Sequence, residues 1–158
     1  VETPAAAIMA DVLAKEVDFF SIGTNDLTQY TLAVDRGNEN VSYLYSALNP
    51  AVIRSIKRII ECAHNAGIEV GMCGEAAADE RMIPLLLAFG LDEFSVTVSR
   101  VLEVRKEIAS WSVKESKDIA QSISGYSEEK EVANYLNDYV MSAKERENVA
   151  EQSQNIEK

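Results

Sequence analysis

The chain has 158 residues, of which 47% are hydrophobic and 26% charged, which is typical of one soluble globular domain. Its 15 basic and 26 acidic residues give a formal net charge of -11, which argues against nucleic-acid binding because there is no basic surface to displace counterions. The longest apolar run, around Ile83 to Phe89, is too short to cross a bilayer, and no basic-then-apolar leader opens the sequence, so we expect a cytoplasmic protein without membrane insertion.

The first residues have the pattern of a strand end that leads into a helix. Thr3 is a good N-cap and Pro4 suits the first helical position, so a helix is predicted over 5–16. A short apolar run at 17–22, ended by Gly23, is typical of a buried parallel strand. Because natural domains rarely begin inside such a junction, we expect a partial sequence.

The middle of the chain alternates helices and strands. After a long connection we expect a helix from Asn49 and Pro50 to Gly67, a strand at 68–73, a helix from Asp79 to Phe89, a strand at 94–98 and a helix to about Ser110. This alternation predicts an α/β fold with a parallel sheet. Half of a (β/α)₈ barrel and part of an open doubly wound sheet both fit the pattern.

Beyond Trp111 the strand pattern stops. Helices are expected near 114–124 and 128–141, and from 142 the sequence is polar with almost no apolar period. We therefore divide the chain into a domain at 1–141 and a polar, disordered tail at 142–158.

Polar side chains follow the predicted strands. Glu2, Asn25, Asp26 and Cys73 stand where strands end, and the carboxyl ends of parallel strands share one crevice. Two carboxylates together with substrate oxygens and water suit Mg²⁺. Spacing alone favours the simpler interpretation, in which Glu2 is a helix-start charge and Asp26 a turn residue.

Several ordered motifs resemble one family. Residues 18–30, DFFSIGTNDLTQY, look like the signature of phosphoenolpyruvate-utilising enzymes, and residues 71–75, GMCGE, resemble their cysteine-bearing signature. Together with ETPA at 2–5, YTLAVDR at 30–36, VSYLY at 41–45 and NPA at 49–51, they are similar to the enzyme I family of the bacterial sugar phosphotransferase system. The likeness runs from Val1 to about Ile108, and more weakly to about Met141.

The resemblance implies the C-terminal half of a (β/α)₈ TIM barrel with extra C-terminal helices, which in the complete protein forms a homodimer. The implied reaction moves the phosphoryl group of phosphoenolpyruvate to a protein histidine and releases pyruvate, as the first step of sugar uptake. A small histidine-containing phosphocarrier protein would dock on an N-terminal region that this chain lacks. We expect these 158 residues alone to be inactive.

Site roles follow from the same resemblance. Glu2 and Asp26 match ligands of Mg²⁺, Asn25 and Asp26 match phosphate contacts, and Arg36 matches a phosphate-binding arginine. Cys73 matches the residue that protonates the enolate carbon C3. A thiol is mostly protonated at neutral pH, and a guanidinium can bind phosphate through two parallel hydrogen bonds, so the residue types suit these roles.

Simpler interpretations exist for individual residues. Without the motif, Cys73 is a small apolar strand-end residue and Arg36 an exposed loop residue that pairs with Asp35. Cys62 is predicted to pack within a helix, and His64 to stabilise a helix end. Ala78 stands where the family pattern has glycine.

Two other functions fit the sequence. Pyruvate, phosphate dikinase and phosphoenolpyruvate synthase share the barrel and both signatures, although 30–45 resembles enzyme I more closely. A non-catalytic dimerisation or sensing module is the alternative of another class.

Overall fold

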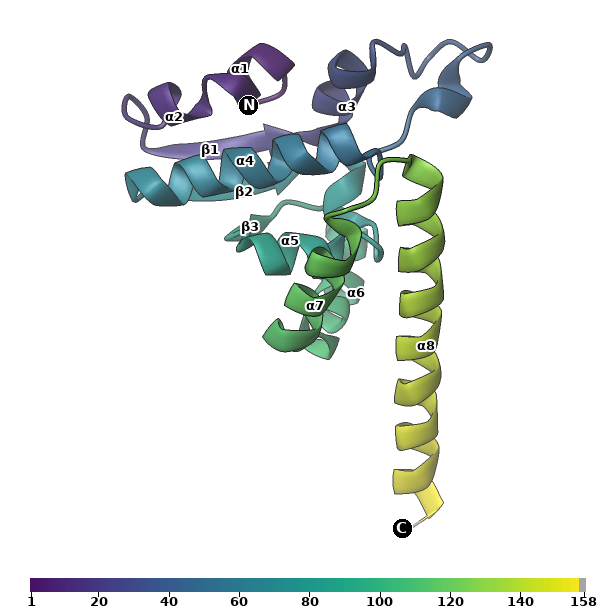
Figure 1. The fold of residues 1–158 in the computed structure, drawn as a ribbon. Helices are drawn as coiled ribbons and strands as arrows, with labels where there is room; N and C mark the ends of the chain where they lie inside the picture. The colour runs from purple at the N-terminus through teal and green to yellow at the C-terminus, as the bar shows by residue number, and fades with distance from the viewer. Residues whose placement is uncertain (157–158) are drawn as a thin grey trace.

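The computed structural model describes the backbone of residues 1–156 and the side chains of residues 1–143. Within this part of the chain, three parallel strands form one sheet in the order β1 (Phe19–Gly23), β2 (Glu69–Cys73) and β3 (Glu93–Phe94). Figure 1 shows α4 (Pro50–Ala66) lying along β1 and β2. The predicted α/β fold with a parallel sheet is therefore confirmed.

The first helix is broken. In place of one helix at 5–16 there are α1 (Pro4–Ile8) and α2 (Ala10–Leu13), although Thr3 Oγ1 accepts from Ala6 N as its predicted capping role requires. The cause lies in α4, where the Arg58 guanidinium donates to the carbonyl oxygens of Ala7 at 3.2 Å and Ile8 at 2.8 Å. Because these carbonyl oxygens accept from Arg58, they do not support a continuous helix over 5–16.

Helix α4 has the predicted boundaries. Asn49 Oδ1 accepts from Ala51 N at 2.9 Å, Pro50 occupies the first turn, and Gly67 ends the helix at a φ of 75°. Between α3 (Thr24–Leu32) and α4 lies the long connection 33–49, which contains the short 3-10 helix η1 (Ser42–Leu44). The buried face of α4 consists of apolar residues that recur with the helical period: Val52, Ile53, Ile56, Ile59, Ile60 and Ala63.

The predicted strand at 94–98 is wrong in its length. After β3, Ser95 N donates to Met72 O, and the chain then turns into η3 (Val98–Arg100). Pairing stops because β2 ends at Cys73 and Gly74 turns away at a φ of 100°. Without a partner strand, Val98 is 92% exposed.

The segment after β2 begins with η2 (Glu75–Ala78) and continues to α5 (Ile83–Phe89). Asp79 accepts from Arg81 N at 2.9 Å as a turn residue, and the helix itself begins later than its predicted cap. Three helices follow: α6 (Val101–Ser110), α7 (Val113–Ile123) and α8 (Glu129–Ile156).

Helix α8 includes most of the segment predicted as a polar tail. Its backbone is helical to Ile156, and Figure 1 shows its C-terminal half extending beyond the other elements. Residues 157–158 lie outside the described part, and the division of the chain at 141 stays a prediction. No helix among the described residues has both the length and the apolar character to cross a membrane.

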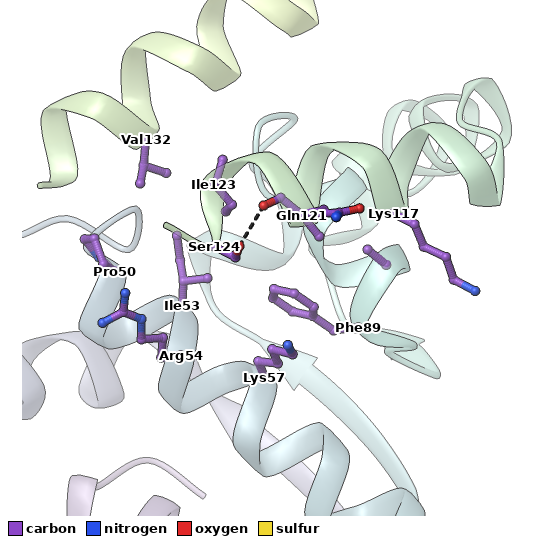
Figure 2. A pocket seen from close by; sticks show the side chains of 12 residues that line it. Pro50, Ile53, Arg54, Lys57, Phe89, Lys117, Gln121, Ile123, Ser124 and Val132 are labelled. Carbon is purple, nitrogen blue, oxygen red and sulfur yellow. Dashed lines mark hydrogen bonds between the residues drawn. The ribbon is translucent and has the colours of Figure 1, made fainter. Parts of the chain in front are cut away.

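The core continues into the C-terminal helices. Ile119 and Ile123 of α7 and Val132 and Leu136 of α8 belong to the same buried cluster as the strands and α4. Cys62 is a buried free thiol in α4, as predicted. Helices α4, α5, α7 and α8 leave a pocket between them (Figure 2).

Asp92 connects the start of β2 to α4. Its Oδ2 atom accepts from Val70 N at 2.8 Å and lies 3.0 Å from His64 Nε2, in the last turn of α4. The predicted stabilisation of this helix end by His64 stays a prediction. Burial acts to raise the pKa of the Asp92 carboxyl, but the Val70 hydrogen bond and the His64 contact outweigh it. The pKa is therefore lowered from its ordinary 3.8.

We expect replacement of Asp92 by asparagine to lower the melting temperature at pH 7 by a few degrees, on the order of 1 kcal/mol, because the carboxylate is partly exposed. A lowered pKa means that the stabilisation is fully present above the unfolded-state pKa. It is lost as the pH falls through the folded-state value. Thermal unfolding followed by circular dichroism should therefore show the two proteins converging below about pH 3.8. A constant difference down to pH 2, or a similar loss in the exposed-acid control Asp118→Asn, would contradict this assignment.

Candidate active site

The predicted site residues lie at one edge of the sheet. In the register of β1 and β2, Gly23 is paired with Cys73, so both strands end at the same level. The Glu2 carboxylate lies against Gly23: a Cβ atom on this glycine would come within 2.6 Å of Glu2 Oε2. Glycine at this position therefore leaves the space that the carboxylate occupies.

Two side-chain hydrogen bonds connect the ends of β1 and β2. Thr24 Oγ1 donates to Cys73 O at 2.9 Å, and Asn25 Oδ1 accepts from Glu75 N at 3.2 Å. Gly74 allows this approach, because a Cβ atom there would lie 2.4 Å from Thr24 Oγ1. The turn that contains Asn25 and the strand end that contains Cys73 thus form one unit.

Tyr45 brings the long connection to this unit. Its hydroxyl donates to Asn25 O at 3.1 Å, and the Arg36 guanidinium and the Thr28 hydroxyl lie close to it. Burial raises the pKa of Tyr45 above its ordinary 10.0, and the positive charge of Arg36 acts in the opposite direction. Arg36 is therefore held on the side of the site where Asn25 lies.

Sequence reasoning assigned Tyr45 no role. It belongs to the quoted stretch 41–45, but a hydroxyl bond to a backbone oxygen 20 residues away leaves no periodic signal.

Glu2 and Asp26 are candidate metal ligands. Within the described part of the chain neither carboxylate has an ion-pair partner, and Asp26 lies in the first turn of α3. No group of three or more histidine, cysteine or acidic side chains among these residues is arranged to hold a metal. The donor set fits Mg²⁺, which commonly binds through one or two carboxylates, with substrate oxygens and water completing the shell.

Cys73 is the last residue of β2, and its thiol is free and exposed. Next to it lies an open depression between the ends of β1, β2 and β3, lined by Asn25, Gly74, Glu75, Ser95 and Arg100, among others. The thiol thus lies at the level of the Asn25 turn and can be reached from solvent.

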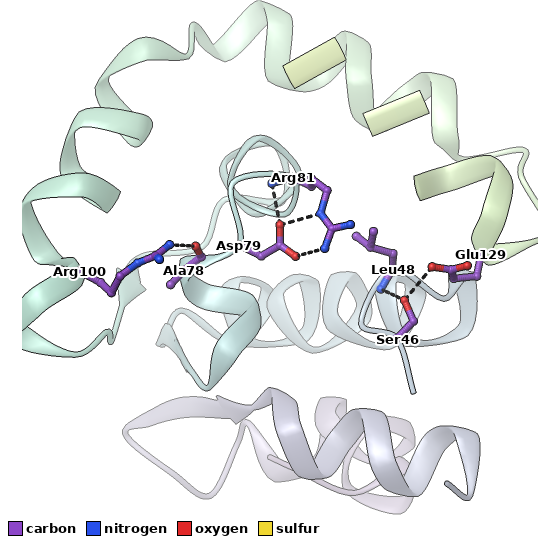
Figure 3. Close-up of polar contacts among 7 residues, drawn as sticks. All are labelled: Ser46, Leu48, Ala78, Asp79, Arg81, Arg100 and Glu129. Carbon is purple, nitrogen blue, oxygen red and sulfur yellow. Dashed lines mark hydrogen bonds and ion pairs between the residues drawn. The ribbon is translucent and has the colours of Figure 1, made fainter. Parts of the chain in front are cut away.

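Polar contacts fix the segments behind the site (Figure 3). Asp79 accepts from Arg81 Nε at 3.0 Å and from Nη2 at 2.6 Å, and this hydrogen bonding raises the pKa of Arg81. Arg100 donates to the carbonyl oxygen of Ala78, the residue that departs from the family pattern. The turn after Cys73 is thereby attached to η3.

Helix α8 supports the long connection. Ser46 Oγ donates to Glu129 Oε1 at 3.0 Å and accepts from Leu48 N at 3.2 Å, and Figure 3 shows these groups together. Ser46 directly follows Tyr45. The start of α8 therefore fixes the end of the connection that contains Arg36.

A comparison with known families identifies the chain. The model of the phosphoenolpyruvate-binding domain of phosphoenolpyruvate-utilising enzymes matches residues 1–113. This chain belongs to that family. The predicted site residues Glu2, Asn25, Asp26, Arg36 and Cys73 all lie within the matched residues, and the resemblance to this family is confirmed.

Relatives in this family include proteins named phosphoenolpyruvate-protein phosphotransferase. That of Staphylococcus aureus is 52% identical over 140 residues, which cover 89% of this chain and 24% of the relative. That of Buchnera aphidicola subsp. Schizaphis graminum is 50% identical over 141 residues, and that of Staphylococcus carnosus 48% over 143 residues. These matches cover 89% and 90% of this chain and 25% of each relative. The chain thus spans about a quarter of the length of the relatives that it matches.

Proposed function

We propose that this chain is the phosphoenolpyruvate-binding part of a phosphotransferase that transfers the phosphoryl group to a protein histidine and releases pyruvate. The main support is the unit formed by the ends of β1 and β2, in which the Asn25 turn lies beside Cys73. Tyr45 contacts both Asn25 and Arg36, and so Arg36 lies near the same turn. The three phosphotransferases compared above favour this function over a dikinase.

The fold of the complete domain is proposed to be a (β/α)₈ barrel. Val1 supports this, because its nitrogen donates to Ser21 O and its oxygen accepts from Gly23 N, the pattern of a parallel neighbour on β1. The assembly is proposed to be a cytoplasmic homodimer that passes its phosphoryl group to a small histidine-containing phosphocarrier protein.

In the proposed reaction the residues act in two places. Arg36 and the Asn25 amide bind the phosphate and orient it toward the acceptor histidine. Glu2 and Asp26 would hold Mg²⁺, which offsets the negative charge of the substrate carboxylate and phosphate when it is bound. As the phosphorus–oxygen bond breaks and a phosphorus–nitrogen bond forms, the electron pair stays on the enolate. Cys73 then donates its thiol proton to C3, and the thiolate regains a proton from water.

The metal assignment is tested with Glu2→Gln and Asp26→Asn in a full-length protein that contains these residues. Each loses one anionic ligand, so the Mg²⁺ concentration for half-maximal phosphoenolpyruvate-dependent histidine phosphorylation should rise more than about tenfold. The matched control is Glu69→Gln, an exposed carboxylate at the opposite end of β2, which should leave this concentration unchanged. An unchanged Mg²⁺ requirement in both site variants would refute the assignment, and the absence of phosphorylated histidine in the unaltered protein would refute the proposed function.

A further inference from the structure

The pocket between α4, α5, α7 and α8 lies outside the active site and differs from it in chemistry. Its volume is about 450 Å³, which falls within the range of small-molecule sites. Most of its wall is apolar: Pro50, Ile53, Ala88, Phe89, Ala120, Ile123 and Val132. A small, highly charged ligand such as phosphoenolpyruvate would gain little from contact with such an apolar surface.

The charge of this pocket is opposite to that of the chain. Arg54, Lys57 and Lys117 line it, and among the residues whose side chains are described no acidic one does. The whole sequence has 26 acidic and 15 basic residues, so this local excess of positive charge is unlike the average surface. Figure 2 shows Arg54 and Lys57 on α4 and Lys117 on α7, with the Phe89 ring between the two helices.

The three cations are available to a ligand. Lys57 Nζ lies 6.0 Å from the centre of the Phe89 ring, and its contact with Glu61 is long, at 3.7 Å, and exposed, so it contributes little. Arg54 Nη2 donates to Tyr126 O at 3.3 Å, which leaves other guanidinium donors. Lys117 has no partner among the described residues.

We propose that this pocket is a second binding site, which takes a small amphiphilic anion: an aromatic or aliphatic body over Phe89 and Ile123, and an anionic group between Lys57 and Lys117. The apolar wall supplies burial, and the rim supplies charge-assisted hydrogen bonds that discriminate an anion from a neutral analogue. This inference is independent of the proposed reaction at Cys73.

The test uses two fluorescent probes on the full-length protein that contains these residues. They are the anion 1-anilinonaphthalene-8-sulfonate and the neutral N-phenyl-1-naphthylamine, which has the same aromatic body. We expect saturable binding of the anion at one site per chain. The double variant Lys57→Gln with Lys117→Gln should weaken binding of the anion about tenfold, which corresponds to about 1.4 kcal/mol. It should leave binding of the neutral probe unchanged. Ala120→Leu, which fills the pocket, should weaken both probes.

The control for charge is Lys15→Gln with Lys114→Gln, which removes the same two charges from exposed positions outside the pocket. Circular dichroism of each variant checks that it is folded. Equal anion affinity in the lysine variant and its control would overturn the proposal. So would full retention of binding in Ala120→Leu, or displacement of the probe by phosphoenolpyruvate, which would place it in the active site.

Discussion

Replacing Cys73 with alanine is expected to slow pyruvate formation by about 10²–10⁴-fold, the usual contribution of a positioned general acid. The thiol is free and exposed at the end of β2, and it is the proposed proton donor to C3. Phosphoenolpyruvate and Mg²⁺ binding should stay largely intact, because the proposed ligands are other residues. A coupled pyruvate assay and a substrate titration on the full-length protein measure the two effects separately.

A sharper readout is the exchange of the pyruvate methyl hydrogens with deuterium from solvent, which requires the same proton transfer in reverse. This exchange should disappear in Cys73→Ala. The control is Cys62→Ala, since this thiol is buried in α4 and serves packing. Undiminished turnover and exchange in Cys73→Ala would exclude the acid role.

Replacing Gly74 with alanine is expected to damage both stability and activity. Gly74 has a φ of 100° and a ψ of -177°, a conformation nearly restricted to glycine, and the added Cβ would lie 2.4 Å from Thr24 Oγ1. Backbone strain of about 1–3 kcal/mol, together with loss of the Thr24–Cys73 hydrogen bond, should lower the free energy of unfolding by about 2–4 kcal/mol. Denaturant unfolding measures this change.

Gly125→Ala is the matched control, because a Cβ atom there meets nothing within 4 Å and the φ is not positive. It should change stability by less than about 0.5 kcal/mol. Equal stability of the two variants would show that the Gly74 conformation is not required.

Sequence reasoning succeeded where the signal is local. Asn49, Pro50 and Gly67 define α4 by capping and backbone conformation, and its apolar period matches the buried face. The strand-end positions of Glu2, Asn25, Asp26 and Cys73 were also predicted, and the parallel arrangement brings the ends of β1 and β2 to one edge. The roles proposed for these residues came from the family resemblance, because strand-end position alone assigns none.

The sequence did not predict features that depend on contacts between residues far apart in the chain. The break after Ile8 depends on Arg58, 50 residues away, and the end of β3 depends on where β2 turns at Gly74. The bond between Ser46 and Glu129 joins residues 83 positions apart. None of these contacts has a pattern that a single segment could reveal.

The bond between Thr24 and Cys73 has a consequence for stereochemistry. It fixes the backbone of Cys73 relative to the Asn25 turn, which is proposed to hold the phosphate, so the thiol would approach a bound enolate from one of its two planar sides. The new hydrogen at C3 would then arrive from that side, and a threonine hydroxyl bonded to the protein backbone would help to set the handedness of an isotopically labelled methyl group.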